Sequence, residues 1–144
     1  MIKPLPDKYV RKAVYDAVNN IVVDTLTIPA YDSRVSGNII PQHFILLTTQ
    51  TSQVNQMTKC ADVWESSILV DIVTTYDGTG NPGDRLLSEN ILDAVRNATN
   101  NLVLDAASGL VVQKQTQDFP NDIVTITENE NIFRKLMRLE LTIN

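Results

Sequence analysis

The chain has 144 residues, of which 43% are apolar and 20% are charged, and its formal net charge is −5. This is the composition of an ordinary globular domain, so it excludes a disordered chain and a membrane-spanning one. The basic residues are scattered along the sequence, which argues against direct binding of nucleic acid. A single cysteine excludes an internal disulfide and a cysteine-rich metal site. Because the first residues lack the apolar core of a signal peptide, we expect the protein in the cytoplasm where it is made.

The N-terminal part of the chain predicts an extended arm, a helix and two short strands. Residues 1–6 form the expected arm, and apolar residues then recur from Val10 to Ile21 at the spacing of one buried helical face, which predicts a helix over residues 7–20. Pro29 interrupts the apolar segment Ile28–Asp32, which is typical of an edge strand or an extended segment. The run His43–Leu47 predicts a strand, and the polar stretch after it predicts a loop near residues 49–62.

The middle of the chain predicts a central strand followed by a second helix. Apolar residues occupy both faces of the segment Ile68–Val73, as expected for a strand that is covered on both sides. This strand is predicted to end at Asp77, and a polar loop is predicted near residues 77–83. Asn81, Pro82 and Asp84 together favour a helix start, because each satisfies or complements free backbone N–H groups. The inward face of that helix is predicted to contain Leu87, Ile91, Ala94, Val95, Ala98 and Leu102.

The last third of the chain predicts three strands. They cover residues 110–117, 123–127 and 133–143, and apolar and polar residues alternate in the last of them, except at Lys135. No internal repeat is present. The sequence therefore predicts an α+β fold in which two helices pack on one mainly antiparallel sheet, as a single compact domain over residues 1–144.

Enzymatic chemistry finds little support in this sequence. His43 is the only histidine and lies beside an apolar strand, so we interpret it as a strand-end residue rather than a general base. Cys60 is interpreted as a small packing residue, because Lys59 is the only basic residue beside it and a reactive thiol needs a more basic environment. Asp71 and Asp77 share one strand face and could approach a third acid, but a hydrogen-bonded or interfacial role is favoured for Asp71. We predict that the protein is not an enzyme and holds no metal or cofactor.

One motif keeps an alternative of another class open. Gly78, Gly80 and Gly83 form a G-x-G-x-x-G run between a predicted strand and a predicted helix, which is the context of a dinucleotide-binding site. Four polar residues separate the apolar strand from the first glycine, whereas in such a site the glycine follows the strand almost at once. The chain after the helix also lacks the further βαβ units of a doubly wound sheet. We therefore favour a flexible connection for this segment.

The order of landmarks resembles a known family. The landmarks are an N-terminal helix, the segment Ile28–Asp32, the strand His43–Leu47, Trp64 followed by Ile68–Thr74, the helical segment Leu86–Ala98 and the closing segment Arg134–Leu141. In this order they look like the tail-terminator, or tail-completion, proteins of tailed bacteriophages. More loosely they resemble the neck proteins that connect head and tail. The resemblance covers most of the chain and rests on element order and weak motifs.

This resemblance implies a structural virion subunit at the head–tail junction, made in the host bacterial cytoplasm. Such a subunit forms a closed homomeric ring, usually six-fold, that caps the tail tube, joins it to the head connector and leaves a channel for DNA. An adaptor ring between portal and tail is the alternative. A closed ring requires that one patch of each subunit meets a different patch of the next. Polar loops are common recognition sites, so the predicted contact residues are Gln53, Val54, Gln56 and Met57.

Overall fold

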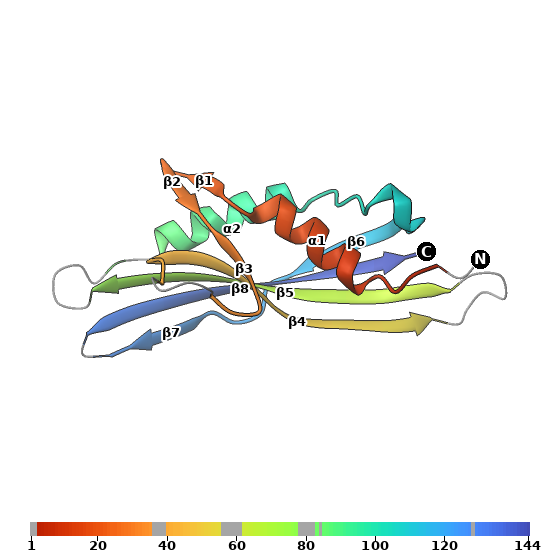
Figure 1. Cartoon of the computed structure of the whole chain (residues 1–144). Coiled ribbons are helices and arrows are strands. Elements are labelled where there is room, and N and C mark those ends of the chain that lie inside the picture. The colour runs from red at the N-terminus through yellow and green to blue at the C-terminus, as the bar shows by residue number, and fades with distance from the viewer. Residues whose placement is uncertain (1–2, 36–39, 56–61, 78–82, 84, 128) are drawn as a thin grey trace.

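The computed structural model describes residues 3–35, 40–55, 62–77, 83, 85–127 and 129–144. In these residues, α1 (Asp7–Val18) and α2 (Leu86–Ala98) lie on the same face of a long twisted sheet (Figure 1). The strands are β1 (Ile21–Val23), β2 (Leu26–Ile28), β3 (Ala30–Asp32), β4 (His43–Asn55), β5 (Val63–Asp77), β6 (Val112–Asp118), β7 (Ile123–Ile126) and β8 (Glu130–Ile143). A 3-10 turn, η1 (Ala106–Ser108), follows α2.

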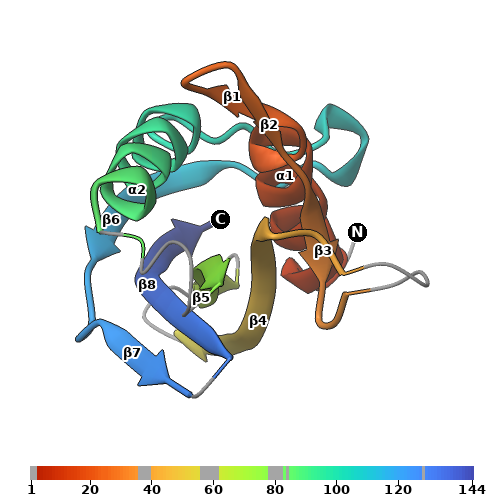
Figure 2. The same ribbon diagram turned by 90° about the vertical axis from the view of Figure 1, so that its left-hand side faces the viewer.

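The main sheet has the strand order β3-β4-β5-β8-β6, and β7 pairs with the other half of the same β8 edge. Every pairing in it is antiparallel except that of β3 with β4. Seen end-on, β4, β5 and β8 wind strongly around one another (Figure 2). The single compact α+β domain with two helices on a mainly antiparallel sheet is therefore confirmed.

Helix α1 forms because apolar residues recur every fourth position and an acid opens the first turn. Val10, Val14 and Val18 are fully buried against the sheet, and Asp7 complements the free N–H groups of the first turn. The helix ends at Val18, two residues before its predicted end, and Ile21 belongs to β1 instead. Within the described part of the chain, β1 and β2 pair only with each other, as a hairpin that the sequence did not reveal.

Helix α2 begins at Leu86, later than the start signals at residues 81–84 predicted. Ile91 and Val95 are fully buried, and Glu89 and Arg96 lie in the first and last turns, where their charges complement the helix dipole. Ala98 was predicted to face inward but is exposed. Leu102 is buried, although it follows the helix.

Strands β4, β5 and β8 are the long strands of the sheet. Both β4 and β5 extend beyond the apolar runs from which they were predicted. Strand β4 continues to Asn55, so the predicted polar loop near residues 49–62 is wrong for residues 49–55. A register shift between Leu47 and Gln50 divides β4 into an apolar half and a polar half. Strand β5 reaches Asp77 as predicted and lies at the centre of the sheet.

Lys135, the exception in the alternation of β8, lies on the helix-covered face of the sheet. Its Nζ lies 2.9 Å from an Asp122 carboxylate oxygen and 3.7 Å from one of Glu89. These ion pairs connect the half-buried Lys135 side chain to the segment before β7 and to α2. Neither described helix is both long and apolar enough to cross a membrane.

Candidate functional site

The predicted contact residues Gln53 and Val54 lie near the end of β4 rather than in a loop. Gln53 is exposed and pairs in register with Glu65, whereas Val54 is half-buried and pairs with Trp64. Gln56 and Met57 lie outside the described residues. Successive side chains of a strand point to opposite faces, so Gln53 and Val54 are presented on different faces of the sheet. A partner that contacts both would have to reach around the end of the strand.

Gln53 borders a hollow of about 550 Å³ at the polar half of the long strands. It is lined by Thr51, Ser52, Gln53, Glu65, Ser66, Ser67 and Glu140. The hydroxyls of Thr51 and Ser67 lie 2.5 Å apart, and those of Ser52 and Ser66 lie 2.9 Å apart. We call this region the hydroxyl end, defined by Thr51, Ser52, Ser66 and Ser67. The Ser52 hydroxyl also donates to an Asp7 carboxylate oxygen, and Glu65 and Glu140 add negative charge to the hollow.

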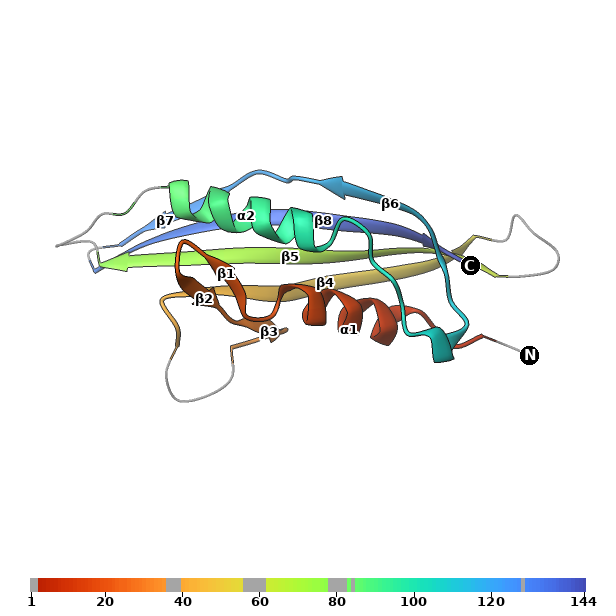
Figure 3. The ribbon, with the colours of Figure 1, turned by 90° about the horizontal axis from the view of Figure 1, so that it is seen from above.

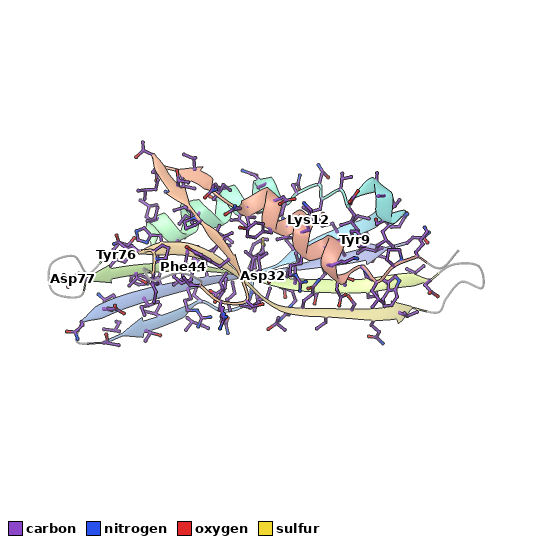
Figure 4. All side chains as sticks on the ribbon, viewed as in Figure 1. Tyr9, Lys12, Asp32, Phe44, Tyr76 and Asp77 are labelled. Atoms are coloured by element: carbon purple, nitrogen blue, oxygen red, sulfur yellow. The ribbon has the colours of Figure 1, made fainter. Side chains whose placement is uncertain are left out.

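The opposite half of the same strands contains a cluster of three rings, which we call the aromatic end: His43, Tyr76 and Phe133. Tyr76 lies between His43 at 5.4 Å and Phe133 at 5.9 Å, measured between ring centroids. Figure 4 places Phe44 and Tyr76 in the half of the sheet that ends at Asp77, away from Tyr9 and Lys12 on α1. Gly83 packs on this cluster, because a Cβ there would lie 2.2 Å from the Tyr76 ring.

Among the described residues, Asp71 is the buried charged side chain, and Arg134 holds it in place. Only 1% of Asp71 is exposed, and the Arg134 Nε donates to both of its carboxylate oxygens, at 3.3 and 3.0 Å. The guanidinium Nη2 donates to the same carboxylate. This hydrogen bonding raises the pKa of Arg134 above its ordinary value. Of the two roles favoured for Asp71 from the sequence, hydrogen-bonded or interfacial, the hydrogen-bonded one is confirmed.

The described residues contain no cluster of metal-binding side chains. Asp71 and Asp77 are six residues apart on one strand, and therefore about 20 Å apart at the usual rise per residue. That separation is too large for a shared cation. Burial lowers the pKa of His43, and its Nδ1 has no hydrogen-bond partner in the described part of the chain. Cys60 lies outside the described residues.

The dinucleotide alternative fails on topology. Strand β5 is followed by α2 and then by β6, but β6 pairs with β8 and is not a neighbour of β5. A dinucleotide site needs a helix that connects two adjacent parallel strands. Gly78 and Gly80 lie outside the described residues, and Gly83 adopts a positive φ of 72° beside Tyr76. Gly83 thus has a packing role.

Sequence reasoning missed a cationic cleft between α1 and β3. The cleft has a volume of about 540 Å³ and is lined by Lys8, Arg11, Lys12, Tyr15, Ala30, Tyr31, Asp32 and Arg34. Two of its cations are paired, Arg11 with Asp32 at 3.2 Å and Lys12 with Asp16 at 2.7 Å. The spacing i, i+3, i+4 of Lys8, Arg11 and Lys12 on one helix would have revealed it. Lys8 and Arg34 add two further positive charges to the lining, so the cleft keeps a net positive charge.

The informative comparison with known proteins is structural. No protein-family model matches the sequence, and no curated protein matches it. A chain in a solved structure described as the virion of a native gene transfer agent particle has a similar fold, with a TM-score of 0.51. The similarity covers 77% of each chain, at 12% sequence identity. At this identity the likeness concerns the fold alone.

Proposed function

We propose that this chain is a structural subunit of a tailed-phage or phage-like virion. The observation that carries the proposal is the fold that it shares with a chain of the gene transfer agent virion, over 77% of both chains. The element order resembles the tail-terminator family, which independently favours the same class. In this role the subunit acts through its surfaces, with no reaction of its own and no cofactor.

The specific role that we propose is a homomeric ring at the head–tail junction. Such a ring caps the tail tube, contacts the head connector and leaves a channel through which DNA passes. The net charge of −5 is compatible with this channel, because an acidic surplus disfavours the phosphate contacts that dominate DNA binding. Closure of the ring explains how growth stops at a fixed number of subunits.

Native mass spectrometry across a concentration series tests this proposal. A discrete hexamer supports the tail-terminator role, whereas a dodecamer supports the alternative, an adaptor ring between portal and tail. A protein that stays monomeric at every concentration would contradict self-assembly into a ring. Electron microscopy of the same sample should show particles with a central opening.

A further inference from the structure

Two of the outer strands of the main sheet, β3 and β7, differ in whether their free backbone edges are capped within the subunit. The carbonyl of Pro29 and the N–H of Ser33 face β4, so the backbone groups of Ala30 and Asp32 face outward. The Ala30 N–H donates to the Asn19 Oδ1 at 3.1 Å, and the Asp32 carbonyl accepts from the Arg34 N–H at 2.8 Å. The β3 edge is thus partly capped within the subunit.

Strand β7 has no such protection. Within the described chain, β8 is the only strand that pairs with β7, and all four residues Ile123–Ile126 are exposed. Ile126 is 73% exposed, and Ile123 and Val124 are 40% and 37% exposed. Folded proteins normally blunt or cover edges of this composition, because an exposed apolar edge templates pairing with another chain. This edge therefore has the properties of a docking site for an extended segment.

The β1–β2 hairpin is a matching extended segment on the same chain. Among the described strands, β1 and β2 pair only with each other, and Val22 and Leu26 are 65% and 41% exposed. The turn between them places Asp24 at φ 48° and Thr25 at φ 70°, a costly conformation for a β-branched residue. The hairpin projects beyond the helices in the end-on view (Figure 2).

The positions of hairpin and edge suit a head-to-tail contact. Seen from above, the hairpin lies on the β3 side of the sheet, and β7 lies on the opposite side, beyond α2 (Figure 3). Both lie in the same half of the molecule. A contact between two different patches is what a closed ring requires, whereas β7 pairing with β7 would produce only a symmetric dimer.

We propose that the open edge of β7 is the docking site for the β1–β2 hairpin of a second copy of this chain. The inference rests on the proposed ring and specifies its subunit interface. Main-chain hydrogen bonds between strands would provide affinity, and the exposed apolar side chains of both segments would be removed from water.

Disulfide trapping tests this pairing. In a Cys60→Ser background, Val22→Cys and Ile126→Cys are introduced singly and together, and the assembled protein is mildly oxidised. The double variant should give a ladder of covalent oligomers on a non-reducing gel, ending at the subunit number of the ring. Neither single variant should give a ladder.

The possible results separate this inference from the proposed function. If the double variant forms rings by native mass spectrometry but no covalent ladder, the ring stands and the β7–hairpin pairing is overturned. If Ile126→Cys alone yields a covalent dimer, β7 pairs with β7 and the hairpin is not its occupant. A protein that neither assembles nor cross-links contradicts both proposals.

A charge placed in the interface provides a second measurement. Ile126→Asp should reduce subunit association by at least about tenfold, since a carboxylate would have to be desolvated at the contact. The unfolding temperature should stay near that of the unaltered chain, because Ile126 is 73% exposed in the subunit. Val103→Asp is the matched control, since Val103 is 84% exposed and lies between α2 and η1. Equal association of the two variants would overturn the inference.

Discussion

The aromatic end and the hydroxyl end occupy the same three strands but are stabilised in different ways. In the segment of β5 from Val70 to Thr74, every residue is buried, on both faces of the sheet. Toward the hydroxyl end, Glu65 is exposed while Ser66 is buried, the alternation of a sheet with only one covered face. The register shift in β4 between Leu47 and Gln50 marks the boundary.

The difference shows that residues on a sheet face can be buried without a second layer of helices or strands packed on that face. Both described helices lie on one face (Figure 1), yet Asp71 and Val73 on the other face are 1% and 7% exposed. Their in-register neighbours on β4 and β8 are Leu46 and Leu136 for Asp71, and Phe44 and Arg134 for Val73. Large side chains on adjacent strands of a strongly twisted sheet therefore exclude water by themselves.

The largest expected effect comes from breaking the ion pair between Asp71 and Arg134. Arg134→Met should lower the free energy of unfolding by about 3–4 kcal/mol, because it leaves the buried Asp71 carboxylate unpaired. Asp71→Leu should cost less, since the Arg134 side chain is 39% exposed and can be hydrated. Urea denaturation of both variants measures the difference.

The double variant Asp71→Leu/Arg134→Met is the control for this pair. An apolar replacement of both partners is often neutral or stabilising, so the double variant should recover most of the loss. A double variant as unstable as Arg134→Met would show that the ion pair itself stabilises the fold.

Gly83 and Gly109 allow one kind of substitution to be compared beside the aromatic end and away from it. Gly83 and Gly109 both have φ of 72°, but a Cβ at Gly83 would meet the Tyr76 ring, whereas at Gly109 its nearest contact is Lys3 at 4.0 Å. Gly109→Ala should cost about 1 kcal/mol for the left-handed backbone. Gly83→Ala should cost about 2–3 kcal/mol, because the packed ring must also shift. Thermal unfolding of the pair checks this, and equal losses would mean that Tyr76 moves freely.

The aromatic end was easier to predict than the hydroxyl end. The apolar runs His43–Leu47 and Ile68–Val73 revealed their strands, because burial requires apolar side chains. Residues Thr49–Asn55 read as a loop, since nearly all are polar, yet cross-strand hydroxyl pairs and main-chain bonds extend β4 through them. The strand propensity of a segment does not include the contribution of a partner strand that is distant in sequence.

The interaction surfaces were the least predictable part. The β1–β2 hairpin turns at Asp24 and Thr25, both with positive φ. Asp tolerates this conformation, but Thr25 stands where glycine usually signals such a turn. The strand of β7 was predicted from its composition, but its exposed edge is a property of sheet order, which pairs β6 and β7 with the same strand. A local pattern gives a strand without saying which strands will be at the edge.

A smaller effect is expected at the hydroxyl end. The double variant Thr51→Val/Ser67→Ala removes both members of the exposed hydroxyl pair at 2.5 Å. Replacing both partners leaves no unsatisfied group, and exposed hydrogen bonds contribute little, so stability should change by less than about 0.5 kcal/mol. A loss above about 1 kcal/mol would show that these hydroxyls hold β4 and β5 together. Chemical denaturation of this variant and of Arg134→Met under the same conditions compares the two ends directly.

The smallest effect concerns pH and the aromatic end. Burial lowers the pKa of His43, so the unfolded chain takes up a proton at a higher pH than the folded chain does. The contribution of the neutral imidazole is therefore complete above the ordinary pKa of 6.5 and is lost as pH falls below it toward the folded value. His43→Phe should flatten the dependence of the unfolding temperature on pH between about 5 and 7, leaving only the carboxylates to titrate. Identical pH profiles for the two proteins would show that His43 is hydrated in both protonation states, and that the ring cluster with Tyr76 does not exclude water from it.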